Sequence, residues 1–387
     1  MLGINQFETL LSALQAPALA VHSKFCSRVR HGLSECTLCS DNCPTKAIEW
    51  TDGILNVDPD GCTSCGICAN VCPNGVFEAL KPNDFEILDK VRLSLHEQKE
   101  VVFECNPDGV DKQNGAIVVP SLARLDEGVL VGCFALGAQA VWLSQGPCQG
   151  CKYEPSQHVA EETVKNANSL LELFGLPRRI LFKGRQAEPL EERATSRREF
   201  FTNLVQETKK VSASLACGLI DNFKEEPPKR VGSLPTCLPM KRKLLLGSMG
   251  KLGNLTEEEF ESPLFCRFEA NGDCTGCQMC AFFCPTGALS KLNEDGKVGV
   301  SFKASDCTAC GLCQEICYRK AVRLSHSVNL RKVINRDIDQ VVMRKDSGVL
   351  PWEQGTRERE VFVRSLLQNT SAIDSEKLRK GGEGLLE

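Results

Sequence analysis

The chain has 387 residues and a net charge of -4, and 42% of its residues are hydrophobic and 25% charged. These values are ordinary for a soluble globular protein of two to four domains, and they provide no strongly basic surface for nucleic acid. No apolar run approaches 18 residues, so no integral membrane segment is expected. The 23 cysteines are the exception. Most lie in short clusters with metal-ligand spacing, which indicates a reducing, cytoplasmic setting rather than a disulfide-bonded secreted protein.

Residues 1–25 are expected to form an N-terminal helix. They contain an apolar stretch at 7–21 and lack the basic segment that opens a secretory signal. A helix packed on its own domain is the simplest interpretation, and contact with a partner or a membrane surface is the alternative.

The first cysteine group contains one incomplete and one complete run of the spacing C-x2-C-x2-C-x3-C-P, which is typical of bacterial ferredoxins. The incomplete run provides Cys36, Cys39 and Cys43, and the complete run provides Cys62, Cys65, Cys68 and Cys72. The missing first cysteine would fall at Leu33. Cys26 can replace it, because the nine-residue loop between Cys26 and Cys36 can bring its thiolate to the cluster. Otherwise Cys26 is a free structural thiol beside a smaller cluster with three cysteine ligands.

In such paired runs the fourth cysteine of each run ligates the cluster of the other run. One [4Fe-4S] cluster is therefore expected on Cys26, Cys36, Cys39 and Cys72. A second is expected on Cys43, Cys62, Cys65 and Cys68. Residues 47–50 and 54–57 flank a turn signal and predict a β-hairpin. Residues 26–90 thus resemble two-cluster bacterial-type ferredoxins, which implies an α+β module whose small core depends on its clusters for folding.

Residues 95–190 alternate between strand and helix patterns. Strands are predicted at 101–104, 116–119, 140–143 and 179–182, and helices at 122–136 and 158–174. This alternation is typical of a parallel α/β domain, in which ligands bind at the carboxyl ends of the strands. Cys105, Cys148 and Cys151 lie at such ends, whereas Cys133 lies inside the first helix.

This middle domain resembles the small iron–sulfur subunit of methyl-viologen-reducing hydrogenase, which links hydrogenase to heterodisulfide reductase. The resemblance rests on residues 128–133, 137–141 and 146–153. It implies a [2Fe-2S] cluster on Cys105, Cys148 and Cys151. Residues 119–121 lack the further cysteine of the family pattern, so Cys133 is the candidate for a fourth ligand. From the residues alone, a redox dithiol at Cys148 and Cys151, a zinc site and purely structural cysteines are alternatives.

Residues 191–262 are predicted to be a helical and basic linker. Residues 196–201 match the twin-arginine motif S-R-R-x-F-F, but they lie deep inside the chain, and an amphipathic helix capped by Ser196 is the simpler account. A basic helix is expected at 241–252, as a solvated face or as a docking surface for an acidic partner. Cys217 and Cys237 are isolated and receive no ligand role.

A second ferredoxin module is predicted at 263–325. The same exchange of fourth ligands assigns one [4Fe-4S] cluster to Cys274, Cys277, Cys280 and Cys317. It assigns another to Cys284, Cys307, Cys310 and Cys313. Residues 288–292 and 298–302 repeat the hairpin of the first module, and Cys266 is expected in the opening strand without a ligand role. The tail, 326–387, shows helical periodicity at 328–342 and 357–367, and its end is expected to be disordered.

The expected fold is thus a pair of α+β ferredoxin-like cluster modules at both ends of a small parallel α/β domain, with helical linkers. Four [4Fe-4S] clusters, and a [2Fe-2S] cluster in the middle domain, would make the chain an electron-transfer subunit that passes single electrons between oxidoreductase subunits. The resemblance implies a hydrogenase, a heterodisulfide-reductase-like flavoprotein or another oxidoreductase as partner in an anaerobic organism.

Two other classes of function compete with electron transfer. The first is an enzyme, a cluster-fed thiol/disulfide reductase with its active dithiol at Cys148 and Cys151. The second is an interaction protein whose clusters are structural. The sequence has no glycine-rich nucleotide motif and no nucleophile elbow, so it favours a relay over an enzyme with its own substrate site.

Overall fold

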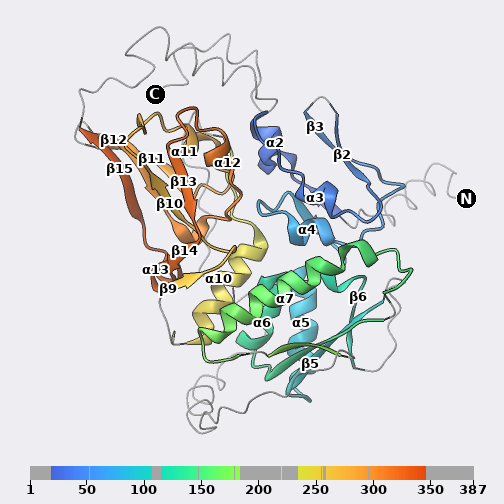
Figure 1. Ribbon diagram of the computed structural model, residues 1–387. Coiled ribbons are helices and arrows are strands. Elements are labelled where there is room, and N and C mark those ends of the chain that lie inside the picture. The colour runs from blue at the N-terminus through green and yellow to red at the C-terminus, as the bar shows by residue number, and fades with distance from the viewer. Residues whose placement is uncertain are drawn as a thin grey trace, which may run out of the picture.

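The computed structural model describes residues 19–51, 53–106, 115–146, 148–177, 179–183, 219, 234–253, 255, 259–294 and 297–345. Figure 1 shows a first module in blue and a second module in orange that lie side by side above a middle domain. Most of the predicted N-terminal helix, the twin-arginine segment and the periodic stretch at 357–367 lie outside the described residues.

The first module is built from two small antiparallel pairs. Strand β1 (Leu19–Val21) pairs with β4 (Phe77–Ala79), and β2 (Ile48–Thr51) pairs with β3 (Ile54–Val57) as the predicted hairpin. The module also contains the 3-10 turn η1 (Ser23–Phe25) and the helices α2 (Ser27–Arg30), α3 (Leu38–Asp41) and α4 (Ile67–Val71). The helix predicted over 7–21 is wrong at its last three residues, because their backbone pairs with β4.

The middle domain is the predicted parallel sheet. Its four strands lie in the order β6 (Ile117–Val119), β5 (Glu100–Cys105), β7 (Ala140–Ser144) and β8 (Ile180–Lys183). Helices α5 (Asp84–Ser94), α6 (Glu127–Ala135) and α7 (Gln157–Glu172) pack in the same core. The helix predicted to begin at 122 begins later. Residues 122–124 form the 3-10 turn η2, and the Asp126 side chain then caps α6 by accepting from the Val129 N–H at 2.9 Å.

Helix α10 (Met240–Leu252) lies at the predicted basic helix, but most of it is buried or half-buried rather than forming a solvated face. It packs on α6 and buries Leu244, Leu245 and Met249. The approach is close, because a methyl group added at Gly128 of α6 would lie 2.6 Å from the Lys241 carbonyl oxygen. The helix therefore belongs to the core that joins the middle domain to the second module.

The second module contains three small sheets. Strand β10 (Arg267–Ala270) pairs with β13 (Val322–Ser325), and β9 (Glu259–Glu261) pairs with β14 (Ser327–Asn329). The predicted hairpin is β11 (Leu289–Glu294) and β12 (Lys297–Phe302), and β15 (Asp339–Lys345) extends it. The short helical elements are η4 (Ala304–Asp306), α11 (Met279–Phe283), α12 (Leu312–Glu315) and α13 (Leu330–Asn335).

The helical periodicity predicted over 328–342 is wrong except in α13. Arg336, with a φ of 60°, adopts the left-handed conformation and ends this helix, and its N–H donates back to Val333 O. The chain then forms β15 against β12, so the described part of the tail completes the sheet of the second module.

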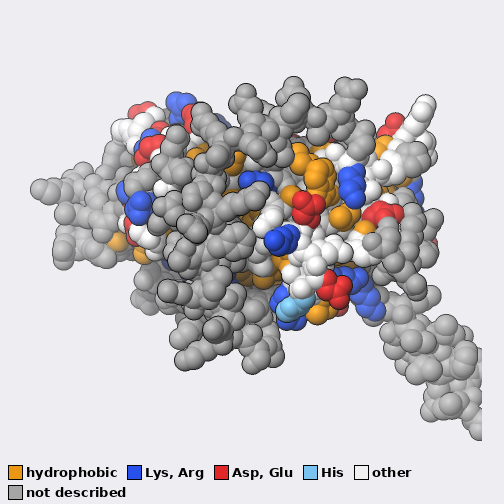
Figure 2. Space-filling model, turned by 90° about the horizontal axis from the view of Figure 1, so that it is seen from below, with side chains coloured by type: hydrophobic (Ala, Val, Ile, Leu, Met, Phe, Trp, Pro, Cys, Tyr) orange, Lys and Arg blue, Asp and Glu red, His pale blue; other side chains and the backbone are white. Residues whose placement is uncertain are grey.

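The described surface mixes charge types. Figure 2, viewed from below, shows lysine and arginine side chains interspersed with acidic and hydrophobic ones over its coloured part. Within the ranges that the structure describes, no helix has both the length and the apolar character to cross a membrane.

Candidate metal centres

The sixteen ferredoxin-type cysteines lie in four groups, each with three members from one run and one from the other. Site A consists of Cys26, Cys36, Cys39 and Cys72. Site B consists of Cys43, Cys62, Cys65 and Cys68. Site C consists of Cys284, Cys307, Cys310 and Cys313. Site D consists of Cys274, Cys277, Cys280 and Cys317. In each group at least one thiol has the other three as electrostatic neighbours.

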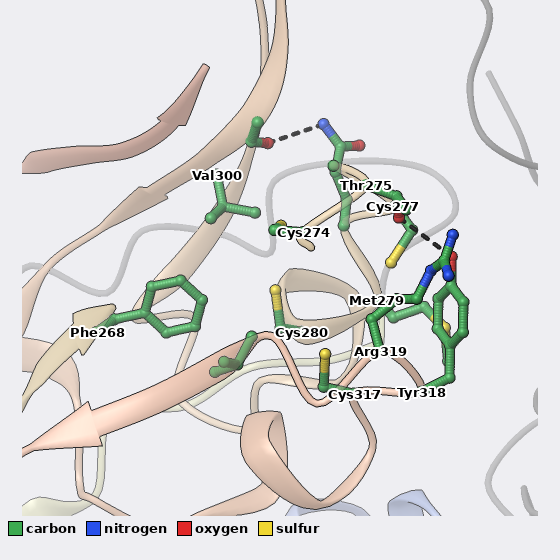
Figure 3. Close-up of a pocket in the computed structure, with 14 residues that line it drawn as sticks. Phe268, Cys274, Thr275, Cys277, Met279, Cys280, Val300, Cys317, Tyr318 and Arg319 are labelled. Carbon is green, nitrogen blue, oxygen red and sulfur yellow. Dashed lines mark hydrogen bonds between the residues drawn. The ribbon is translucent and has the colours of Figure 1, made fainter. Parts of the chain in front are cut away.

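Sites B and D each surround a pocket lined by all four of their cysteines. The empty space, part of it open to solvent, is about 470 Å³ at site D and about 360 Å³ at site B. Figure 3 shows the sulfur atoms of Cys280, from α11, and Cys317, from the turn before β13, directed into the same space beside Phe268 and Val300. In the described part of the chain no three His, Cys, Asp or Glu side chains lie close enough to chelate a single metal ion. Thiols spaced around a pocket of this kind fit a cluster of several atoms.

The backbone of each complete run turns twice before its third cysteine. In every case the residues before and after the second cysteine have positive φ, between 54° and 78°: Ser64, Gly66, Gly276, Gln278, Ala309 and Gly311. Alternating left- and right-handed residues direct successive N–H groups to one side, an arrangement that suits anions. A short helix, α4, α11 or α12, then carries the third cysteine. The incomplete run lacks this feature, since Thr37 has a φ of -125°.

Burial is the leading cause of a raised pKa at several of the cluster thiols. It raises the pKa of Cys310 to about 12, and the neighbouring Cys284 sulfur raises it further. Burial likewise raises the pKa of Cys39, Cys68 and Cys280. Free thiolates are therefore disfavoured, and metal binding at these sites must be coupled to release of the thiol protons.

Sites A and C adjoin across the boundary between the two modules. Asn74 Nδ2 donates to Ser27 Oγ at 2.9 Å, and Thr308 Oγ1 donates to Asn74 Oδ1 at 3.2 Å. The Ser27 hydroxyl also hydrogen-bonds the Cys310 thiol of site C. Because Ser27 follows Cys26 and Thr308 follows Cys307, these contacts connect ligand loops of the two sites directly.

Arg30 crosses the same boundary. Its side chain is fully buried, and Nη1 donates to the carbonyl oxygens of Phe283 at 3.1 Å and Cys284 at 3.2 Å. Nη2 donates to Pro235 O and Nε to Lys24 O at 2.9 Å. Burial lowers the pKa of Arg30 to about 10. The guanidinium still carries its positive charge at neutral pH.

Site B adjoins the middle domain. Ser156 Oγ, at the end of the 3-10 turn η3 (Glu154–Ser156), donates to the carbonyl oxygen of Asn42, the residue before Cys43, at 3.1 Å. Cys65 shares the main hydrophobic core with Tyr153, and Cys151 packs against that core. The segment that follows Cys151 thus contacts the first module beside Cys43 of site B.

The structure brings together three of the four middle-domain cysteines. Cys148 and Cys151 are electrostatic neighbours of Cys105, and the N–H of Cys151 donates to the Cys148 carbonyl at 2.9 Å. Burial raises the pKa of Cys105. Cys133 does not join them: it is fully buried in α6, where its thiol donates to Val129 O at 3.3 Å. The described residues therefore supply three thiols, one fewer than the four cysteines that usually hold a [2Fe-2S] cluster.

Three residues to which the sequence assigned no role at a metal centre lie at site C. The Cys266 sulfur is 3.2 Å from that of Cys307, and Arg242 Nη2 donates to the Cys307 carbonyl at 2.5 Å. The third is Arg30. Linear spacing carries no signal for Cys266 or Arg242, because sheet pairing and the packing of α10 bring them there. The unusual length of the loop between Cys26 and Cys36 is the only sequence signal for Arg30.

Comparisons with known proteins agree with this organisation. Residues 34–76 and 273–321 each match the 4Fe-4S dicluster domain, and residues 108–207 match the delta subunit of methyl-viologen-reducing hydrogenase. An uncharacterized ferredoxin from Methanocaldococcus jannaschii is 44% identical over 46 residues, which are 12% of this chain and 74% of the relative. No solved structure matches the chain.

Two further relatives belong to larger assemblies. Pyruvate synthase subunit PorD from Thermotoga maritima is 38% identical over 52 residues, 13% of this chain and 52% of that protein. A component of an ion-translocating oxidoreductase complex from Methanosarcina acetivorans is 36% identical over 47 residues, 12% of this chain and 18% of the relative. The chain thus spans about half of the first and less than a fifth of the second.

Proposed function

The chain belongs to the 4Fe-4S dicluster ferredoxins and carries a methyl-viologen-reducing hydrogenase delta-subunit domain between its two dicluster domains, and from this we propose that it relays single electrons along one line of sites. The order of the line is middle domain, site B, site A, site C and site D. When bound, [4Fe-4S] clusters at the four sites would supply one-electron redox chemistry. The chain's own residues hold neighbouring sites together and keep water away from them.

The observation that carries this order is the junction between sites A and C. Ser27, Asn74 and Thr308 connect their ligand loops through buried or half-buried hydrogen bonds. Within each module, the exchange of fourth cysteines makes the two sites neighbours. Cys39 of site A is also an electrostatic neighbour of Cys68 of site B, and Cys284 of site C is one of Cys280 of site D. Contacts of Ser156 and Cys65 support the step from the middle domain to site B.

The ends of this line are where partner subunits would dock. The middle domain resembles a hydrogenase subunit, so a hydrogenase or a heterodisulfide-reductase-like flavoprotein is the partner we propose there. The relatives in pyruvate synthase and an ion-translocating oxidoreductase make another oxidoreductase subunit the natural partner at site D. Oxygen-sensitive clusters and unpaired cysteines suit the cytoplasm of an anaerobe.

Electron paramagnetic resonance (EPR) of the anaerobic, fully reduced, cluster-loaded chain tests the order, because neighbouring paramagnetic clusters couple magnetically. Cys310→Ala with Cys313→Ala removes site C, and Cys277→Ala with Cys280→Ala removes site D; each should lose about four irons of about sixteen. Loss of site C should leave site D as an isolated spin. Loss of site D should leave the coupling among sites B, A and C intact. Site D still coupled in the absence of site C would refute the proposed order.

A second candidate function is thiol/disulfide chemistry at Cys148 and Cys151. The observation in its favour is that the described residues bring three rather than four thiols together in the middle domain. In that case two electrons, delivered singly from site B, and two protons would convert a partner disulfide into two thiols. Thiol labelling of the iron-loaded chain separates the two functions. Reactive Cys148 and Cys151 at about sixteen irons favour the dithiol, whereas protection at about eighteen favours a [2Fe-2S] relay.

A further inference from the structure

Two buried arginines converge on site C, and both come from outside its cysteine runs. Arg30 ends α2 of the first module and is fully buried, while Arg242 lies in α10 and is 6% exposed. Arg30 donates to the carbonyl oxygen of Cys284 at 3.2 Å, and Arg242 donates to that of Cys307 at 2.5 Å. Two distant segments therefore place a positive charge against two different ligands of the same site.

Carboxylates are at most secondary neighbours of these guanidinium groups: Glu127 and Asp306 follow Cys307 and Cys266 among the charged groups that act on Arg242. In the described ranges no ion pair joins Arg30 or Arg242 to an aspartate or glutamate, and Nη1 of Arg242 is buried without a hydrogen-bond partner. Their leading charged neighbours are cysteines: Cys284 and Cys310 for Arg30, and Cys307 for Arg242. Buried cations without an ion-paired counterion are unfavourable, so an anion at site C stabilises both arginines.

The other sites lack this arrangement. Site A faces one residue of each sign, Lys241 and Glu315, whose effects oppose each other. At site B, the leading charged neighbours of Cys65 and Cys68 are other cysteines. Arg319 lines the pocket of site D (Figure 3), but it is exposed, and water screens its charge. Site C is thus the one described site that is contacted by two buried arginines without an ion pair.

We propose that Arg30 and Arg242 make site C the highest-potential site of the four, the place where an electron rests between the two modules. This inference rests on the proposed function. A ferredoxin-type centre gains one negative charge when it accepts one electron, and buried positive charge stabilises that reduced form most. The electron enters from a reduced partner subunit and leaves to an oxidised one, so the step needs no proton and breaks no bond.

The test is a potentiometric titration of the anaerobic, cluster-loaded full chain followed by EPR. The first signal to appear on reduction should be that of site C, and it should be absent when Cys310 and Cys313 are both replaced by alanine. Arg30→Gln and Arg242→Gln should each lower the reduction equilibrium constant of that signal by about tenfold or more, which is 59 mV for one electron. Arg30→Lys, which keeps the charge without the bidentate geometry, should retain most of the wild-type value.

Arg319→Gln is the matched control, because it removes an exposed arginine beside a different site and should leave the site C signal unchanged. Iron content must equal that of the wild type in each arginine variant, which separates a change in potential from loss of the cluster. A wild-type iron content with unchanged potentials in both glutamine variants would overturn the inference. Missing clusters or absent coupling between sites A and C in the wild-type chain would instead overturn the proposed function.

Discussion

Asn70 is the side chain whose loss should most damage the contact between the first module and the middle domain. It lies in α4 between two ligands of sites A and B and is 6% exposed. Its Nδ2 lies 3.0 Å from Ala123 O, 2.9 Å from Leu125 O and 3.1 Å from Thr163 Oγ1. Asn70→Ala leaves two buried carbonyl oxygens without this donor, at about 1 to 3 kcal/mol each, so we expect a loss of about 2 to 6 kcal/mol.

Hydrogen exchange of the anaerobic, cluster-loaded chain measures this loss locally, which matters because a multidomain protein does not unfold in one step. At about 1.4 kcal/mol per factor of ten, amides of α4 and η2 should exchange roughly 30 to 20,000 times faster. Asn166→Ala is the control. It removes one half-buried hydrogen bond to Glu127 inside the middle domain and should cost about 1 kcal/mol. Equal exchange in Asn70→Ala and wild type would show that the amide does not support the contact.

Three further predictions concern the same core and site C. Burial raises the pKa of Asp126 to about 7, so the folded chain binds this proton more tightly than the unfolded chain. Stability should therefore fall as pH rises from about 4 to 7, by roughly 4 kcal/mol in total, and Asp126→Asn should flatten the dependence of the thermal midpoint on pH. Gly128→Ala should destabilise the protein by about 1 to 3 kcal/mol because its methyl group meets Lys241 O, whereas Gly250→Ala in α10, with open space around it, should raise the thermal midpoint. Cys266→Ala should leave the iron content unchanged but lower the reduction equilibrium constant of site C several-fold in an EPR titration, because it removes a sulfur hydrogen-bonded to Cys307.

The predictable features were those that short-range spacing or periodicity encodes. The parallel sheet follows from apolar strands that alternate with helices, and strands β5, β6, β7 and β8 lie within one or two residues of their predicted positions. The hairpins follow from turn signals between alternating residues, as β2 and β3 show. The cysteine spacings identify the two dicluster domains.

The features that the sequence did not predict depend on long-range packing. A run of lysine and arginine at 241–243 suggested a surface, yet α10 is a core helix, because the glycines of α6 allow its backbone to approach closely and Arg242 finds carbonyl acceptors. The periodicity of the tail predicted a helix. Beyond Arg336, however, the chain forms strand β15, which pairs with the edge of β12. Neither result is encoded within a window of neighbouring residues.

The irregular first cysteine run explains how the two similar modules are joined asymmetrically, through sites A and C. Nine residues separate Cys26 from Cys36, where the complete runs have two between their first two cysteines. The additional chain forms α2, and both ends of this helix reach the second module: Ser27 contacts Cys310, and Arg30 donates to Cys284 O. Leu33, at the position of the missing cysteine, is 50% exposed and makes no such contact. A regular run would begin at residue 33, after this helix. The longer loop that begins at Cys26 therefore also contains the residues that bring site A against site C.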